Sequence, residues 1–127
     1  MSDEASSMLP AGWLRGVELF NQGEYFACHE ALEPLWLAAR GDEKTFLHAV
    51  IQLAAALHHW RHGNLKGAGS LCRRAADKLR TVPARMFQLD ARMLSAQVAG
   101  YLRQTETTAN PPRIILSPVT APRGLRS

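Results

Sequence analysis

The stretch "EKTFLHAVIQLAAALHHWRH", residues 43–62, decides the fold. When it is projected as a helix at 100° per residue, apolar side chains cover most of the circumference. A narrow wedge, which holds His48, Gln52, His59 and His62, is polar. Because a helix that is apolar on most sides must be surrounded by other helices, this stretch predicts a buried helix at the centre of an all-α domain.

Helical periodicity continues on both sides of this stretch, and no segment shows a useful length of strand-like alternation. Glycines and capping residues divide the sequence into four further helices, expected at about 10–22, 24–40, 65–81 and 90–104. The fold class that follows is all-α, a compact five- to six-helix bundle around a central buried helix at about 43–62.

The chain divides into two parts by composition. Residues 1–104 are expected to form a single helical-bundle domain, which is a usual size for one hydrophobic core. Residues 105–127 carry four of the seven prolines and show no helical period. They predict a Pro-rich basic C-terminal tail that is extended or disordered, with Ile114, Ile115 and Leu116 docking on the body.

Several features indicate a cytoplasmic protein. The N-terminus has no basic region followed by an apolar stretch, which argues against a signal peptide. The longest apolar run, residues 49–57, is too short to cross a membrane as a helix. The two cysteines, Cys28 and Cys72, lie far apart in apolar contexts and predict buried thiols in a reducing compartment.

Charge is unevenly distributed along the chain. Residues 1–63 hold four Lys/Arg against eight Asp/Glu, whereas residues 64–127 hold eleven against three. A basic half can mark a nucleic-acid surface, but these cations are spread over two helices and the tail, with no aromatic residues between them. Nucleic acid is therefore not favoured as a partner, and a homo-oligomer stays among the open alternatives.

One polar constellation stands out in "YFACHEALEPLW", residues 25–36. On a helix, His29 and Glu33 share a face and Trp36 follows one turn later. Aromatic residues on both shoulders predict that this pair is partly enclosed. Because an unpaired buried carboxylate costs several kcal/mol, Glu33 is expected to have a partner.

Two interpretations of that partner stay open. In the first, His29 and Glu33 bind a divalent metal such as Zn, Fe or Mn, with a further ligand from the central helix, for which His58 and His59 are candidates. Glu30 and Gln52 would support such a site and Trp36 would form its wall. An open coordination position would permit hydrolytic or redox chemistry, although the zinc-protease pattern HExxH is absent.

In the second interpretation, Glu33 pairs with His29 or Arg61 and fixes the crossing of two helices. The domain would then be a non-catalytic helical protein-interaction module. Paired buried polar groups are common in proteins and ligand sites are few, so residue types alone do not decide whether the protein is an enzyme.

Three spaced segments, "FNQGEYFACHEALEPLW", "FLHAVIQLAAALHHWRHGN" and "GAGSL", resemble the bacterial and archaeal domain-of-unknown-function family numbered 309. The pattern HxxxExx followed by Trp or Tyr is matched by His29, Glu33 and Trp36. The resemblance implies an all-helical domain and suggests that the pattern binds metal, and the family has no assigned activity. Pro34 departs from the family pattern, where a helix-favouring residue is usual.

Overall fold

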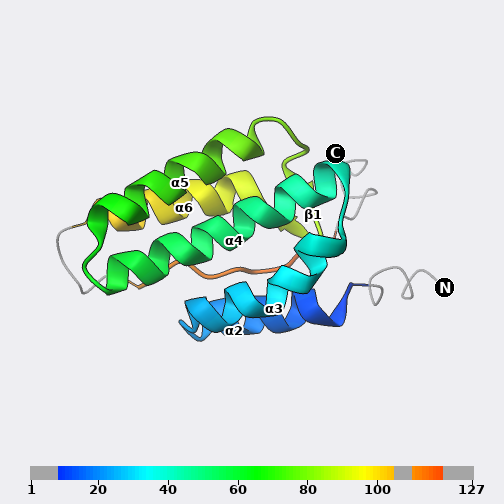
Figure 1. Cartoon of the computed structure of the whole chain (residues 1–127), viewed down its shortest axis with the longest axis horizontal. Coiled ribbons are helices and arrows are strands. Elements are labelled where there is room, and N and C mark those ends of the chain that lie inside the picture. The colour runs from blue at the N-terminus through cyan, green and yellow to red at the C-terminus, as the bar shows by residue number, and fades with distance from the viewer. Residues whose placement is uncertain (1–8, 105–109, 119–127) are drawn as a thin grey trace, which may run out of the picture.

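Helix α4 (Gly41–Arg61) lies between the other helices, and the prediction of a central buried helix is confirmed (Figure 1). The computed structural model describes residues 9–104 and 110–118, and five α-helices run through these residues. The buried residues of α4 come from most sides of the helix: Phe46, Leu47, Ala49, Val50, Ile51, Gln52, Leu53, Ala54, Ala56 and Leu57. The all-α fold class is thereby confirmed.

Two helical hairpins form most of the bundle. The first joins α2 (Ala11–Asn21) to α3 (Tyr25–Ala38), and the second joins α4 to α5 (Leu65–Leu79). Each turn contains a glycine with positive φ, +80° at Gly23 and +83° at Gly63, a backbone conformation that L side chains rarely adopt. The glycines that the sequence places at helix ends therefore reverse the chain.

The short connection between α5 and α6 (Ala91–Leu102) contains a feature that the sequence analysis missed. Strands β1 (Arg85–Met86) and β2 (Leu89–Asp90) pair antiparallel. Their turn holds two non-glycine residues at positive φ, Phe87 at 54° and Gln88 at 64°. The ring of Phe87 lies 5.2 Å from that of Trp13, whose indole Nε1 donates a hydrogen bond to the Phe87 carbonyl. Tertiary contacts thus hold a turn that local sequence does not favour.

Residues 110–118 form an extended segment, here called the strap, that runs along the bundle between α2 and α6 (Figure 1). Ile114 is buried, and its backbone N–H and C=O both bond to the side chain of Asn21. The backbone N–H of Ser117 donates to the carbonyl of Gln88. Docking of this apolar segment is confirmed, whereas Ile115 points to solvent. Residues 105–109 and 119–127 of the expected tail lie outside the described residues, and the division at 104 stays a prediction.

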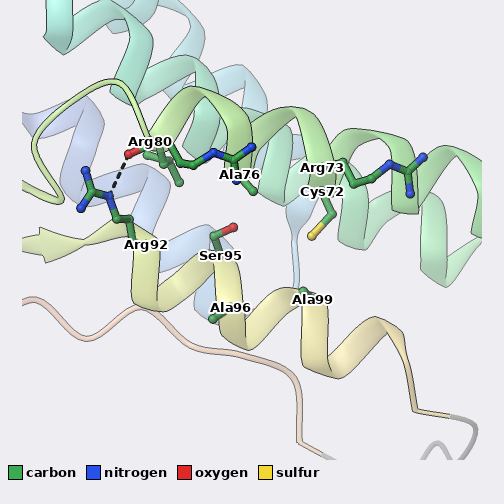
Figure 2. Close-up of a pocket in the computed structure, with 9 residues that line it drawn as sticks. Cys72, Arg73, Ala76, Arg80, Arg92, Ser95, Ala96 and Ala99 are labelled. Atoms are coloured by element: carbon green, nitrogen blue, oxygen red, sulfur yellow. Dashed lines mark hydrogen bonds between the residues drawn. The ribbon is translucent and has the colours of Figure 1, made fainter.

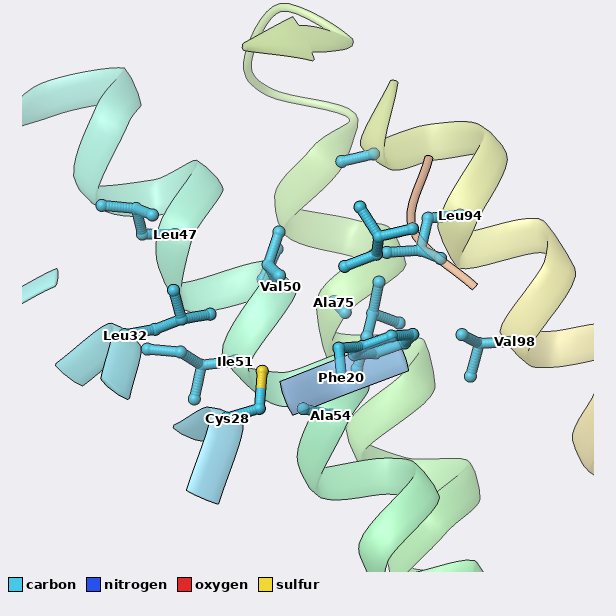
Figure 3. Packing of buried hydrophobic residues seen from close by; sticks show 14 of the residues in the cluster. Phe20, Cys28, Leu32, Leu47, Val50, Ile51, Ala54, Ala75, Leu94 and Val98 are labelled. Atoms are coloured by element: carbon cyan, nitrogen blue, oxygen red, sulfur yellow. The ribbon is translucent and has the colours of Figure 1, made fainter. Parts of the chain in front are cut away.

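The core continues from α4 into its neighbours. Leu32 and Cys28 of α3 meet Ile51 of α4, and Val98 of α6 closes the other side (Figure 3). Both cysteines are buried free thiols, as expected. Burial raises the pKa of Cys28 to about 12, so this thiol stays protonated and packs as an apolar group. Within the described ranges, no helix is both long and apolar enough to cross a membrane.

Candidate functional site between α3 and α4

The aromatic member of the candidate site packs as a wall against α4. The ring of Trp36 stacks on that of His48 with centroids 4.7 Å apart and an angle of 23° between the planes. Lys44 places its ammonium 5.3 Å from the Trp36 ring and donates a hydrogen bond to the Trp36 carbonyl at the end of α3. This lysine holds the short connection between the two helices and keeps the indole in place.

His29 and Glu33 face outward more than the sequence analysis expects. His29 is half-buried beside Phe26, with ring centroids 6.2 Å apart, whereas Glu33 and the neighbouring Glu30 are exposed. The expectation of an enclosed pair is therefore wrong for Glu33. The physical reason is that α2 and α4 cover the Cys28 and Leu32 side of α3 and leave the Glu33 side open.

Neither of the two protein partners considered for Glu33 is observed. Across residues 9–104 and 110–118, Glu33 makes no ion pair with His29 or Arg61. Arg61 instead donates a 2.7 Å hydrogen bond to the Gly23 carbonyl and lies 4.7 Å from the Tyr25 ring. Arg61 thus ties the end of α4 to the turn between α2 and α3, and the carboxylate of Glu33 stays available.

Unlike the exposed side chain of Glu33, the side chain of Gln52 is buried. It is 7% exposed, and its carbonyl oxygen Oε1 is fully buried without a hydrogen-bond partner in the described structure. It follows His48 by one turn on α4, so the two side chains share a face of that helix. Most of the polar wedge of α4 is at least half covered, because α5 packs along this side of α4. A buried amide oxygen without a partner is unusual enough to require a reason.

His48 has an environment that favours the neutral imidazole. Desolvation by burial lowers its pKa, and the positive charges of Lys78, His29 and Lys44 lower it further. A neutral imidazole retains a lone pair for a metal ion or a hydrogen-bond donor.

The other two histidines considered as ligands, His58 and His59, lie about three turns beyond His48 on α4. His58 is half-buried, and its ring centroid lies 5.9 Å from that of Phe26 and 4.4 Å from that of His62. His59 contacts the side chain of Asn64 through Nδ1. Both belong to the C-terminal end of α4 rather than to the Trp36–His48 end.

The residues at this face could supply two protein ligands to a metal ion, but not the full set of four that a structural zinc site has. In the described part of the chain, no three His, Cys, Asp or Glu side chains gather closely enough to hold one ion. His29 and Glu33 nevertheless offer a nitrogen and an oxygen one turn apart. Two protein ligands with the remaining positions left to water are usual for hard divalent ions.

Sequence reasoning missed the lysines that frame this face, Lys44 and Lys78. It also gave His48 no settled role. The Trp36–His48 contact could have been predicted from the short, two-residue connection between α3 and α4. This connection forces the two helices to run antiparallel side by side, and the register that joins Trp36 to His48 also joins Phe26 to His58.

The fold and site together define a small all-helical domain built from two helical hairpins, with a histidine- and carboxylate-bearing face between α3 and α4. The chain belongs to the family described as domain of unknown function (DUF309), whose model matches residues 13–71. The matched residues include His29, Glu33, Trp36, His48 and Gln52, and they end within α5.

The chain is also similar to two other proteins. The crystal structure of a conserved hypothetical protein from Thermus thermophilus is similar to 75% of this chain and 98% of that one, with 38% identity and a TM-score of 0.66. An uncharacterized protein of Aquifex aeolicus (strain VF5) is 24% identical over 99 residues. That alignment covers 75% of this chain and 28% of the Aquifex protein, so this chain matches about a quarter of the length of that relative.

Proposed function

We propose that the domain binds a divalent metal ion at the α3–α4 face, with His29 and Glu33 as its protein ligands. The observation that carries the proposal is the exposed Glu33 carboxylate, one turn from the imidazole of His29 and without an ion pair to His29 or Arg61. Nitrogen and carboxylate ligands suit Mn, Fe and Zn. Because few protein ligands are within reach, the ion would keep several positions for water or substrate.

The surrounding residues have roles consistent with such a site. Trp36 would form one wall, and the neutral imidazole of His48 would accept a proton or a hydrogen bond beside it. A bound divalent ion supplies Lewis acidity and lowers the pKa of its water, which suits hydrolytic reactions. Enzymatic activity is accordingly part of this proposal.

Metal binding is tested on tag-free protein with Mn, Zn and Fe(II), measured by equilibrium dialysis and elemental analysis. We expect roughly one ion per chain in the wild type and a rise in melting temperature when the ion is added, because an ion that binds the native state stabilises it. His29→Ala and Glu33→Gln should lose both effects. Glu43→Gln, a change at an exposed carboxylate in the first turn of α4, serves as the matched control and should retain both.

The outcomes separate metal binding from a structural role. If the two site variants bind as much metal as the Glu43→Gln control, the proposal fails. If the wild type binds no ion, and His29→Ala and Glu33→Gln both lower the melting temperature in chelator, the pair is structural instead.

A second candidate function is favoured by two exposed apolar side chains on α3. Phe26 is 56% exposed and Leu37 is 61% exposed, and a spacing of eleven residues places them on one side of the helix, with Glu30 and Glu33 between them. Such a stripe suits a helix-mediated contact with a second copy of the chain.

Sedimentation over a range of protein concentrations tests this contact. Self-association should weaken in Phe26→Ser and in Leu37→Ser, and should persist in the control Leu65→Ser, which removes an exposed leucine on α5. A monomeric wild type at all concentrations would remove this candidate function.

A further inference from the structure

Two adjoining cavities lie between α5 and α6, away from the α3–α4 face. One has a volume of about 340 Å³ and the other about 260 Å³. They share Cys72, Arg73 and Ala99 in their linings, so they form one groove along the two helices, here called the α5–α6 groove. Its volume lies in the range of sites that enclose small molecules.

The floor of the groove is apolar with one hydroxyl group. Small side chains let α5 and α6 leave this space open: Ala76, Ala96 and Ala99 line it. Cys72 from α5 and Ser95 from α6 are 7% and 6% exposed, and their polar atoms turn toward each other across the gap (Figure 2). At the far end the groove reaches Trp60 and Leu102. A flexible alkyl chain fits such a floor.

The rim of the groove is positively charged. The residues that line the two cavities include four arginines and no Asp or Glu. Two of the four already have partners, since Arg80 pairs with Asp77, and Arg92 donates to the carbonyls of Leu79 and Val82. The other two are Arg73, which lines both cavities, and Arg103, which lines the second. The groove thus places an uncompensated cationic rim above an apolar floor.

We propose that the α5–α6 groove binds a linear alkyl carboxylate, with the chain along the floor and the carboxylate at Arg73. A guanidinium binds a carboxylate through two parallel hydrogen bonds, and the apolar floor removes the chain from water.

Catalysis by Cys72 is not part of this proposal. Burial raises the pKa of the Cys72 thiol, and this effect exceeds the opposing influence of Arg103 and Arg73. The thiol is therefore protonated at neutral pH and acts as part of the apolar floor. Its position nevertheless makes it a reporter, because a ligand in the groove would cover it.

Calorimetry with three probes tests the choice of ligand in the presence of chelator, which separates the result from metal binding at the other face. Decanoate, kept below its micelle concentration, should bind and should raise the melting temperature. Decyltrimethylammonium carries the same chain with a cationic head and should bind at least tenfold more weakly. Acetate carries the head without the chain and should not bind measurably. Equal binding of the first two probes, or of acetate and decanoate, would overturn the proposal.

Variants then place the binding in the groove. Arg73→Ala should weaken decanoate about tenfold, as expected for the loss of one charge-assisted contact, and Arg73→Lys should retain part of the affinity. Arg74→Ala changes the exposed neighbour that does not line the groove and should bind like the wild type. Ala99→Leu fills the space shared by both cavities and should abolish binding. The same affinity in Arg73→Ala and Arg74→Ala would refute the assignment.

Alkylation of the wild-type protein tests the same site without relying on variants, which can misfold. Cys28 is 0% exposed and Cys72 is 7% exposed, so alkylation of the native protein by N-ethylmaleimide should occur first at Cys72. Decanoate should slow this reaction severalfold, whereas decyltrimethylammonium should leave its rate unchanged. If decanoate leaves the alkylation rate unchanged, the groove is not its site.

Discussion

A Cβ atom at Gly16 of α2 would lie 2.5 Å from Cδ2 of Leu32 in α3. Leu32 therefore occupies the space that a side chain at position 16 would need. Leu32 is 1% exposed and is enclosed by the core, so it cannot move away into solvent. Gly16→Ala should therefore destabilise the protein by about 1–3 kcal/mol through overpacking, measured as the free energy of unfolding in denaturant.

Gly12, one turn earlier, provides the control. A Cβ there meets its nearest atoms at 3.4–3.5 Å, which is ordinary contact. Gly12→Ala should be neutral or stabilise by up to about 1 kcal/mol, because alanine favours a helix more than glycine does. The double change Gly16→Ala with Leu32→Val should recover part of the loss. A Gly16→Ala protein as stable as Gly12→Ala would show that the interface adjusts.

The strap depends on the side chain of Asn21. Its Oδ1 accepts from the Ile114 N–H at 2.7 Å and its Nδ2 donates to the Ile114 carbonyl at 2.9 Å. Asn21→Ala removes both bonds and should cost about 1–3 kcal/mol, with faster hydrogen exchange in residues 110–118. Gln22→Ala, at the exposed neighbour, should change neither quantity. Exchange in the strap as slow as in the wild type would show that Ile114 burial alone holds it.

The hairpin turn should respond in opposite directions to two glycine substitutions. Gln88 adopts a positive φ of 64° without burying its side chain, so Gln88→Gly should relieve backbone strain and stabilise the protein by about 1 kcal/mol. Phe87→Gly relieves similar strain but loses ring contacts with Trp13 and Phe46, and it should destabilise. Thermal unfolding of both variants measures the change in stability. A change of the same sign in the two variants would contradict the prediction.

Stability should fall in mild acid because of His48. Its folded pKa lies below the value of about 6.5 for an unfolded histidine, since burial, Lys78, His29 and Lys44 disfavour the charged ring. The unfolded state then binds more protons as the pH falls below about 7. The unfolding free energy should therefore decrease through this range and level off below the folded pKa.

Denaturant unfolding between pH 5 and 8 checks this dependence, with an NMR titration of the imidazole signals. His58, whose pKa is also lowered by burial and by its charged neighbours, contributes in the same direction. His48→Gln should reduce the slope by more than His62→Gln, which acts only through the pKa of His58. An unchanged slope in His48→Gln would assign the effect to other groups.

Local signals were sufficient to predict the helices. The limits of α4 and the reversals at Gly23 and Gly63 follow from periodicity and from glycine conformation, which are properties of short segments. Asn64 and Asp90 cap their helices by accepting from the N–H groups of Gly67 and Met93. The buried cysteines also followed from their apolar context.

The surroundings of the candidate site could not be predicted in the same way. A helical projection of α3 shows which side chains share a face but not which face its neighbours cover, so exposed Glu33 was expected to be enclosed. Arg61 was one of the partners considered for Glu33, whereas it donates to the Gly23 carbonyl from the next hairpin. The turn at Phe87 and Gln88 contains no glycine or asparagine, so the sequence gives no local signal for it. Its conformation is instead held by the contact of Phe87 with Trp13 of α2. Each of these results depends on tertiary packing.

The strap has a consequence for the order in which the protein folds. Asn21 and Ile114 are separated by 93 positions, so their hydrogen bonds close nearly the whole described chain into one loop. During synthesis, α2 through α6 leave the ribosome before Ile114 does, and domains generally begin to fold from the N-terminal side. The helices are therefore expected to assemble first with the Asn21 amide still hydrated, and the last contact to form is the one that joins the two ends of the fold.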